Sequence, residues 1–224
     1  MERFLYQDLV NWKNQKDHKP LILEGARQVG KTWLLKQFGK NEFENFVYIN
    51  CDNNPQIEDV FIDYDVERII RNLSAISNIK IESEKTLIIL DEIQQSPKAL
   101  TSLKYFNEQV PQLHVAVAGS LLGLMDHYGS GFPVGKVETL NLYPLSFMEF
   151  LLAMKKGILV SQIMNHNWAE MNSIITQLTE LLRQYYFVGG MPAVVLDYVQ
   201  NNDIQKVRLL QNQIIQDYQK DISK

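Results

Sequence analysis

Residues 21–32 read Leu21-Ile22-Leu23-Glu24-Gly25-Ala26-Arg27-Gln28-Val29-Gly30-Lys31-Thr32. The stretch joins a short apolar run to a loop bounded by glycines and then to the start of a helix, which is the context that the pattern G-x-x-x-x-G-K-[ST] requires. Glycines without a Cβ let successive backbone N–H groups approach a phosphate chain, and the helix N-terminus adds donors and partial positive charge. The sequence therefore predicts a strand, a phosphate-binding loop and a helix, in this order.

Two side chains carry the chemistry of the predicted loop. Lys31 is expected to reach the β- and γ-phosphates of a nucleoside triphosphate, and the Thr32 hydroxyl to hold Mg²⁺. The residues expected to contact the nucleotide are Gly25, Ala26, Arg27, Gln28, Val29, Gly30, Lys31, Thr32 and Trp33. The alternative is a strand-to-helix turn that matches the pattern by accident.

A second signal is the pair Asp91-Glu92, which follows the apolar run 86–90. Such a run is expected of a strand buried on both faces of a parallel sheet, and open α/β sheets bind ligands at the carboxyl ends of their strands. Asp91 is the candidate Mg²⁺ ligand, and Glu92 is the candidate base that orients or deprotonates the attacking water. A solvated acidic turn would look the same in isolation, but its position after a phosphate-binding loop favours the catalytic interpretation.

Two more polar residues are candidates for catalysis. Ser120 follows the apolar run 115–118, and its hydroxyl could bond the water or the γ-phosphate, or could bond its own backbone in a turn. Lys136 ends the glycine-dense stretch 125–136, which could be a mere connection or could close over a ligand. In the second case Lys136 would be a mobile cation for transition-state charge.

The periodicity of the whole chain predicts an α/β fold in two parts. Apolar runs at 21–23, 46–50, 86–90, 115–118 and 137–142 predict a five-stranded, mostly parallel sheet sandwiched by helices. One helix is expected to end at a Gly39 cap, and another to begin with a capping box at Ser146 and close at Gly157. We therefore assign residues 1–157 to a nucleotide-binding core with an N-terminal helix. Residues 158–224 are assigned to a small helical lid and the start of a linker.

Composition excludes several classes of protein. The chain has 224 residues, 46% of them hydrophobic, which is enough for one full core and a small helical appendage. No apolar run approaches membrane-spanning length, and the N-terminus lacks the apolar core of a secretory signal. A single cysteine, Cys51, fits a reducing compartment, so we expect a cytoplasmic protein without membrane partners. The net charge is −4 and the basic residues are scattered, so this stretch does not support nucleic-acid binding.

Six segments point together to a family. They are Gly25-Ala-Arg-Gln-Val-Gly-Lys-Thr32, Leu87-Ile-Ile-Leu-Asp-Glu-Ile-Gln94, Ala118-Gly-Ser120, Tyr143-Pro-Leu-Ser-Phe-Met-Glu-Phe150, Gly189-Gly-Met-Pro192 and Asp217-Tyr-Gln-Lys-Asp-Ile-Ser-Lys224. In this combination the chain resembles the AAA-type P-loop ATP-binding proteins of bacteria and archaea, in which an ATPase module precedes a C-terminal domain of unknown function. The phosphate loop alone marks only a superfamily. Its combination with Pro-Leu-Ser-Phe and Gly-Gly-x-Pro is specific.

The resemblance implies further placements. The strand ending at Ser120 would lie between the phosphate-loop strand and the strand ending at Asp91, with Ser120 at a sensor position. The segment ending at Pro192 is similar to the Gly-x-Pro turn of STAND-class switch ATPases, where the lid meets the adenine. Many relatives have arginine where this chain has Lys136, which lacks the bidentate fork of a guanidinium. Relatives also continue past this chain's end, so we expect a missing C-terminal domain, through which nucleic acid could be bound.

The leading functional interpretation is a Mg²⁺-dependent ATPase that couples its nucleotide state to movement of the lid or of a partner. The expected ligands are ATP or ADP, and the partner would be another protein or a second copy. ATP is favoured over GTP because no Asn-Lys-x-Asp tetrapeptide occurs. The alternative is a STAND-like nucleotide-gated switch with little turnover. A small-molecule kinase is the third interpretation, and the helical part offers it few arginines for clamping phosphate.

Overall fold

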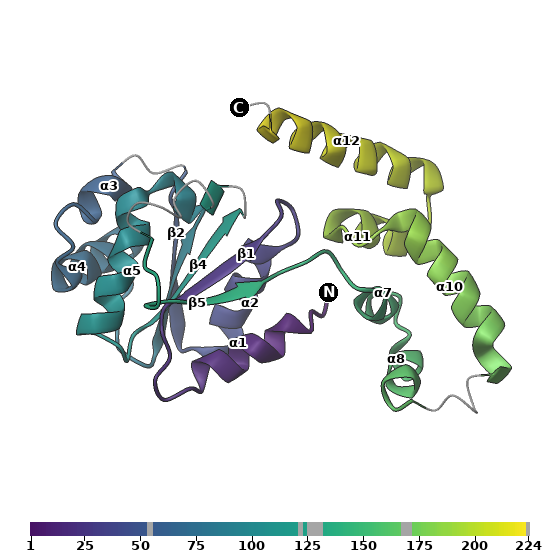
Figure 1. Ribbon diagram of the computed structural model, residues 1–224, viewed down its shortest axis with the longest axis horizontal. Helices are drawn as coiled ribbons and strands as arrows, with labels where there is room; N and C mark the ends of the chain where they lie inside the picture. Colours follow the sequence, from purple (N-terminus) through teal and green to yellow (C-terminus); the bar gives the residue numbers. More distant parts are fainter. Residues whose placement is uncertain (53–55, 121–122, 125–131, 167–171, 223–224) are drawn as a thin grey trace. The chain divides into compact units, whose positions relative to one another are not determined.

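The computed structural model describes residues 1–52, 56–120, 123–124, 132–166 and 172–222 (Figure 1). Contacts divide the chain into two units. The sheet unit consists of Leu5–Ala26 and Gly30–Leu142. The helical unit consists of Met1–Phe4, Arg27–Val29 and Tyr143–Lys224.

Five parallel strands form the centre of the sheet unit. They are β1 (Leu21–Gly25), β2 (Asn45–Asn50), β3 (Thr86–Asp91), β4 (His114–Ser120) and β5 (Glu138–Asn141). Their order is β2-β3-β4-β1-β5, and every pairing is parallel. The predicted five-stranded sheet is therefore confirmed. The order also confirms that β4, which ends at Ser120, lies between β1 and β3.

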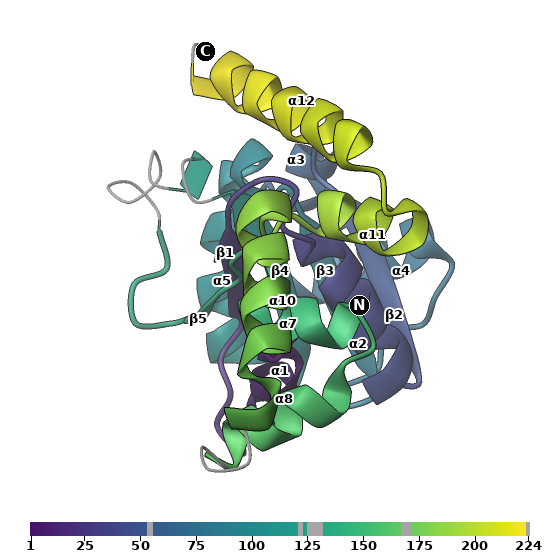
Figure 2. The same cartoon turned by 90° about the vertical axis from the view of Figure 1, so that its right-hand side faces the viewer.

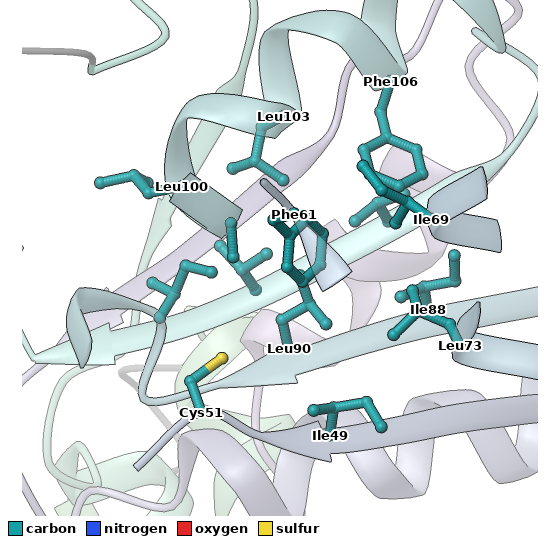
Figure 3. Packing of buried hydrophobic residues seen from close by; sticks show 14 of the residues in the cluster. Ile49, Cys51, Phe61, Ile69, Leu73, Ile88, Leu90, Leu100, Leu103 and Phe106 are labelled. Carbon is teal, nitrogen blue, oxygen red and sulfur yellow. The ribbon is translucent and has the colours of Figure 1, made fainter. Parts of the chain in front are cut away.

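Helices cover both faces of the sheet, as Figure 1 shows. They are α1 (Leu5–Lys13) and α2 (Lys31–Glu42) on one face, and α3 (Ile57–Val60), α4 (Val66–Ser77) and α5 (Pro97–Gln109) on the other. Ile88 and Leu90 of β3 point into the cluster beneath α4 and α5, together with Leu103 (Figure 3). The alternate residues Leu87 and Ile89 are equally buried. Both faces of β3 are thus covered, as its continuous apolar run predicts.

Two glycines act differently from their predicted roles. Gly39 does not end its helix, because α2 continues to Glu42. A Cβ on Gly39 would come within 2.9 Å of Phe46 Cγ, so this position is small to let β2 pack closely against α2. Gly157 likewise does not close the helix that begins after Ser146. That helix, α7, ends at Ala153, and Gly157 begins α8.

The helical unit has its own hydrophobic core. Its elements are α7 (Phe147–Ala153), α8 (Gly157–Met164), the 3₁₀ turn η2 (Asn172–Ile174), α10 (Ile175–Val188), α11 (Pro192–Asn201) and α12 (Ile204–Ile222). In this unit α10 packs against α7 (Figure 2). The Tyr185 ring of α10 lies 5.7 Å from the Phe147 ring and 5.5 Å from the Phe150 ring of α7. The α7 capping box at Ser146 is present as predicted. Among the described residues, no helix combines the length and apolar character needed to cross a membrane.

The Gly-Gly-x-Pro segment packs directly on the segment that leads into α7. Leu145 N–H donates to the Gly190 carbonyl at 2.7 Å, and a Cβ on Gly190 would lie 2.3 Å from the Leu145 carbonyl oxygen. Gly189 has φ 75°, a left-handed conformation that favours glycine. Both glycines are therefore explained by backbone geometry. By contacts, residues 143–157, which the sequence interpretation assigns to the core, fall within the helical unit, and the domain boundary itself stays a prediction.

Candidate nucleotide site

The predicted phosphate-binding loop begins at the carboxyl end of β1 and ends where α2 begins. Gly30, the residue before α2, has φ 98°, in the left-handed region. Gln28 also has a positive φ, of 64°. Such a conformation is uncommon for a residue with a Cβ, and residues that adopt it are often found in functional loops. Among the described residues, no side chain caps α2 and no acidic residue occupies its first turn. The first N–H groups of α2 therefore suit an anionic ligand.

Lys31 is the first residue of α2, directly after this loop. Its side chain is buried, and Nζ donates to the carbonyl oxygens of Gly25 and Ala26, each at 2.8 Å. The loop backbone thus holds the ammonium close to the residues that were predicted to surround the phosphates. An ammonium with three donors can bridge loop carbonyls and an anion.

Thr32 and Asp91 meet where α2 begins and β3 ends. Thr32 Oγ1 donates to Asp91 Oδ2 at 2.7 Å, and Asp91 is buried. These are the two residues that the sequence predicts as magnesium ligands. Hydroxyl and carboxylate oxygens are hard ligands of the kind that Mg²⁺ prefers. The pair fits that ion.

Tyr48 is a third member of this cluster, and sequence reasoning missed it. Its O–H donates to the same Asp91 Oδ2 at 2.9 Å, and Lys36 Nζ lies 3.4 Å from its ring centroid. Burial, followed by the hydrogen bond to Asp91, raises the pKa of Tyr48 to about 12. A usable signal existed: Val47 and Ile49 face the cluster beneath α4, so strand alternation turns Tyr48 to the α2 side.

The adjacent carboxylates of Asp91 and Glu92 give this end of the sheet a negative electrostatic potential. Burial, then Asp91 and other acids including Glu92, raises the pKa of the Cys51 thiol to about 12. The same two acids contribute to the raised pKa of Tyr48. Cys51 therefore remains a neutral buried thiol. A divalent cation would offset this local negative charge, which is a second respect in which the residues fit Mg²⁺.

Glu92 adopts an unusual backbone conformation directly after β3. Its φ is 51°, in the left-handed region, and its N–H donates to the Asp91 side chain at 3.1 Å. The 3₁₀ turn η1 (Ile93–Gln95) follows. Gln94 Nε2 donates to Glu92 Oε2 at 2.6 Å. Gln94 is a second residue that sequence reasoning missed, since nothing in its local pattern marks it as polar support for Glu92.

Ser120 pairs in register with Gly25, so it lies beside the start of the loop. Its Oγ accepts from the Gly123 N–H at 3.2 Å, which is the turn contact that the sequence left as an alternative. A hydroxyl that accepts one hydrogen bond can still donate another. Lys136 forms an ion pair with Glu108 at 3.0 Å, and the stretch 125–131 before it lies outside the described residues.

The remaining candidates are distributed over both units. Trp33, on the first turn of α2, is 46% exposed. Pro192 begins α11 in the helical unit, and its expected contact with adenine stays a prediction. The loop tip Arg27–Val29 also belongs to the helical unit. There Val29 O accepts from Arg3 at 2.9 Å, and Arg27 O accepts from the Tyr218 hydroxyl at 2.6 Å.

A family model and a solved structure agree with the fold described above. A family described as an AAA domain matches residues 17–151, and a domain of unknown function (DUF8612) matches residues 179–224. No curated protein matches the sequence. The chain is similar to a Walker-type ATPase of Pyrococcus abyssi, with 15% identity and a TM-score of 0.62, over 99% of this chain and 75% of that chain. At this identity the likeness shows the fold.

Two further solved structures are similar over a smaller part of this chain. The ORC1 protein of Aeropyrum pernix, solved in complex with DNA, has 15% identity and a TM-score of 0.44, over 65% of this chain and 45% of that chain. Cdc6p of Pyrobaculum aerophilum has 16% identity and a TM-score of 0.42, over 67% of this chain and 47% of that chain.

Proposed function

Since the chain belongs to the family of AAA domains, we propose that its sheet unit binds ATP with Mg²⁺ and hydrolyses the bond between the β- and γ-phosphates. The observation that carries this proposal is the 2.7 Å hydrogen bond between Thr32 Oγ1 and Asp91 Oδ2. It brings two oxygen ligands together next to the buried Lys31. Thr32 and Asp91 would hold the Mg²⁺ ion, which when bound would offset the negative charge that develops on the phosphates.

The chain's own residues would supply binding and proton transfer. Backbone N–H groups of residues 25–30 and the Lys31 ammonium would hold the phosphates. Glu92 would orient a water and accept its proton as the water oxygen bonds to the γ-phosphorus, and ADP would leave as the bridging P–O bond breaks. Ser120 and Lys136 would stabilise charge on the γ-phosphate, and Trp33 and Pro192 would border the rest of the nucleotide.

Coupling of the nucleotide state to the helical unit is the finer part of the proposal. The phosphate loop is divided between the units, since Arg27–Val29 belong to the helical unit and Gly30 to the sheet unit. Phosphates bound by this loop would therefore alter two contacts of the loop, the one between Val29 and Arg3 and the one between Arg27 and Tyr218. The single cysteine favours a cytoplasmic protein. There the nucleotide state would control the movement of a protein partner or of a second copy of this chain.

Replacing Glu92 by glutamine tests the hydrolytic role. In calorimetry, Glu92→Gln should bind ATP and Mg²⁺ like the wild type. Its rate of phosphate release should fall by about 100-fold or more, because the amide cannot accept the proton. Lys31→Ala should lose the binding itself. The matched control is Glu67→Gln, which changes an exposed glutamate on α4 and should alter neither quantity. Wild-type turnover by Glu92→Gln would show that the base is another residue.

A nucleotide-gated switch with little turnover is the second candidate. It is favoured by the contacts of α12 with the loop tip, where Gln28 Nε2 donates to Asp217 Oδ2 at 3.2 Å and Tyr218 donates to the Arg27 carbonyl. Such contacts could exchange with nucleotide binding. Steady-state phosphate release and the nucleotide that co-purifies with the protein separate the two candidates. Rapid phosphate release by the isolated chain would exclude the switch.

A further inference from the structure

We propose that Gln94 is a positioning residue that orients the Glu92 carboxylate for proton transfer. This inference rests on the proposed hydrolysis and adds a residue that the phosphate-loop and Asp-Glu motifs do not include. Its basis is the 2.6 Å hydrogen bond from Gln94 Nε2 to Glu92 Oε2, together with the close packing of Gln94 on the segment that follows β4.

The backbone turns at Glu92 so that Gln94 can reach back to it. Glu92 has φ 51°, and its N–H bonds the Asp91 carboxylate at 3.1 Å, which ties the turn to the end of β3. The 3₁₀ turn η1 follows immediately, so a side chain two residues later comes beside the Glu92 carboxylate. A left-handed non-glycine residue needs support from its surroundings. The hydrogen bond from the Glu92 N–H to Asp91 and the one from Gln94 to the Glu92 carboxylate provide this support.

Two glycines leave the room that the Gln94 side chain occupies. A Cβ on Gly119 would lie 3.0 Å from Gln94 Oε1, and a Cβ on Gly123 would lie 2.6 Å from Gln94 Cγ. The Gly123 N–H in turn donates to Ser120 Oγ at 3.2 Å. Gln94 therefore packs between the candidate base and the backbone that holds the candidate sensor. Its side chain has little freedom to rotate away from Glu92.

The chemistry of the bond suits a base that must be aimed. A glutamine amide is neutral and does not titrate, so it can orient the Glu92 carboxylate without taking up the proton that this carboxylate accepts from water. A carboxylate has two oxygens, so fixing Oε2 leaves Oε1 able to accept from water. Misplacing a catalytic group by about 1 Å can cost about 100-fold in rate. Loss of the Gln94 bond should therefore lower turnover and leave nucleotide affinity nearly unchanged.

The test replaces Gln94 by methionine, which has a similar length and no N–H donor. In the full chain, kcat for ATP should fall about 10- to 100-fold, while the affinity for ATP and Mg²⁺ stays within about twofold. Gln95→Met is the matched control, because Gln95 is exposed on the same turn, and it should keep the wild-type kcat. If Gln94→Met does not fold, Gln94→Asn keeps the amide but shortens its reach, with the same expectation.

A double-mutant cycle separates positioning from a merely structural role. In a Glu92→Gln background, Gln94→Met should reduce the residual rate no further, because the carboxylate that it orients is gone.

Three outcomes overturn the inference while the proposed hydrolysis stands. They are an unchanged or raised kcat in Gln94→Met, an equal loss in the Glu92→Gln background, or a loss of affinity that accounts for the slower rate. If the wild-type chain binds ATP but releases no phosphate, the proposed hydrolysis fails first, and the inference fails with it.

Discussion

Replacing Arg3 by methionine should destabilise the helical unit by about 3–5 kcal/mol, because it leaves a buried carboxylate without its cation. The Arg3 and Glu149 side chains are only 5% and 7% exposed, and Arg3 Nε lies 3.0 Å from Glu149 Oε1. The guanidinium also donates to the carbonyl of Val29 at 2.9 Å and to that of Tyr143. Methionine fills much of the same volume but cannot donate, so one carboxylate and two carbonyls lose this partner.

Urea unfolding followed by far-ultraviolet circular dichroism measures this loss. The midpoint should fall with little change in slope, and the thermal midpoint should drop by roughly 6–20 °C, at about 2–4 °C per kcal/mol for a chain of this size. Arg71→Met is the matched control, since Arg71 pairs with Glu67 at 3.6 Å with side chains 65% and 85% exposed. Exposed pairs contribute up to about 1 kcal/mol. If Arg3→Met costs no more than Arg71→Met, the reasoning from burial is refuted.

Two further predictions concern Tyr48 and a buried histidine pair. Tyr48→Phe removes the donor that orients Asp91, so Mg²⁺ affinity in the presence of ATP should weaken about 10-fold or more, whereas Tyr105→Phe on α5 should not change it. Burial, followed by the neighbouring His18, lowers the pKa of His114 to about 4, and burial also lowers the pKa of His18. Between about pH 6.5 and pH 4 the unfolded chain then binds more protons, so the free energy of unfolding should fall by about 3 kcal/mol on acidification through this window. His114→Phe should flatten that dependence in urea titrations, and a flat wild-type profile would contradict the prediction.

Local pattern was enough to predict the parts of the site whose geometry is set by single elements. The strand, loop and helix of residues 21–42 place Lys31 and Thr32 without help from distant residues. Asp91 follows from a different rule, since carboxyl ends of parallel strands share one edge of the sheet. The 2.7 Å contact between Thr32 and Asp91 is what the two rules together predict.

The supporting residues were not predicted because their partners depend on tertiary placement. Tyr48 reaches Asp91 only because β2 pairs with β3 in the register that sets Asn50 beside Asp91. Gln94 reaches Glu92 only because Glu92 adopts a left-handed conformation. This conformation is uncommon for a glutamate and cannot be predicted from the residue type. Hydrogen bonds across strands and turns of this kind have no periodic signature.

Gly39 shows the opposite error, in which a strong local signal is overruled. A glycine near the end of a helical pattern predicts a cap, yet here its missing Cβ serves a close approach by Phe46. Packing between α2 and β2 decides its role. The sequence shows the glycine but not the neighbour that requires it.

The first four residues have a consequence for any attempt to study the helical unit separately. Arg3 supplies the cation for Glu149, and the Phe4 N–H donates to the same carboxylate oxygen at 2.9 Å, although both residues lie far from Glu149 in the sequence. An excised fragment starting at Tyr143 would leave the Glu149 carboxylate without its cation. Expression of that fragment would need the N-terminal tetrapeptide restored, either grafted through a linker or added as a synthetic peptide.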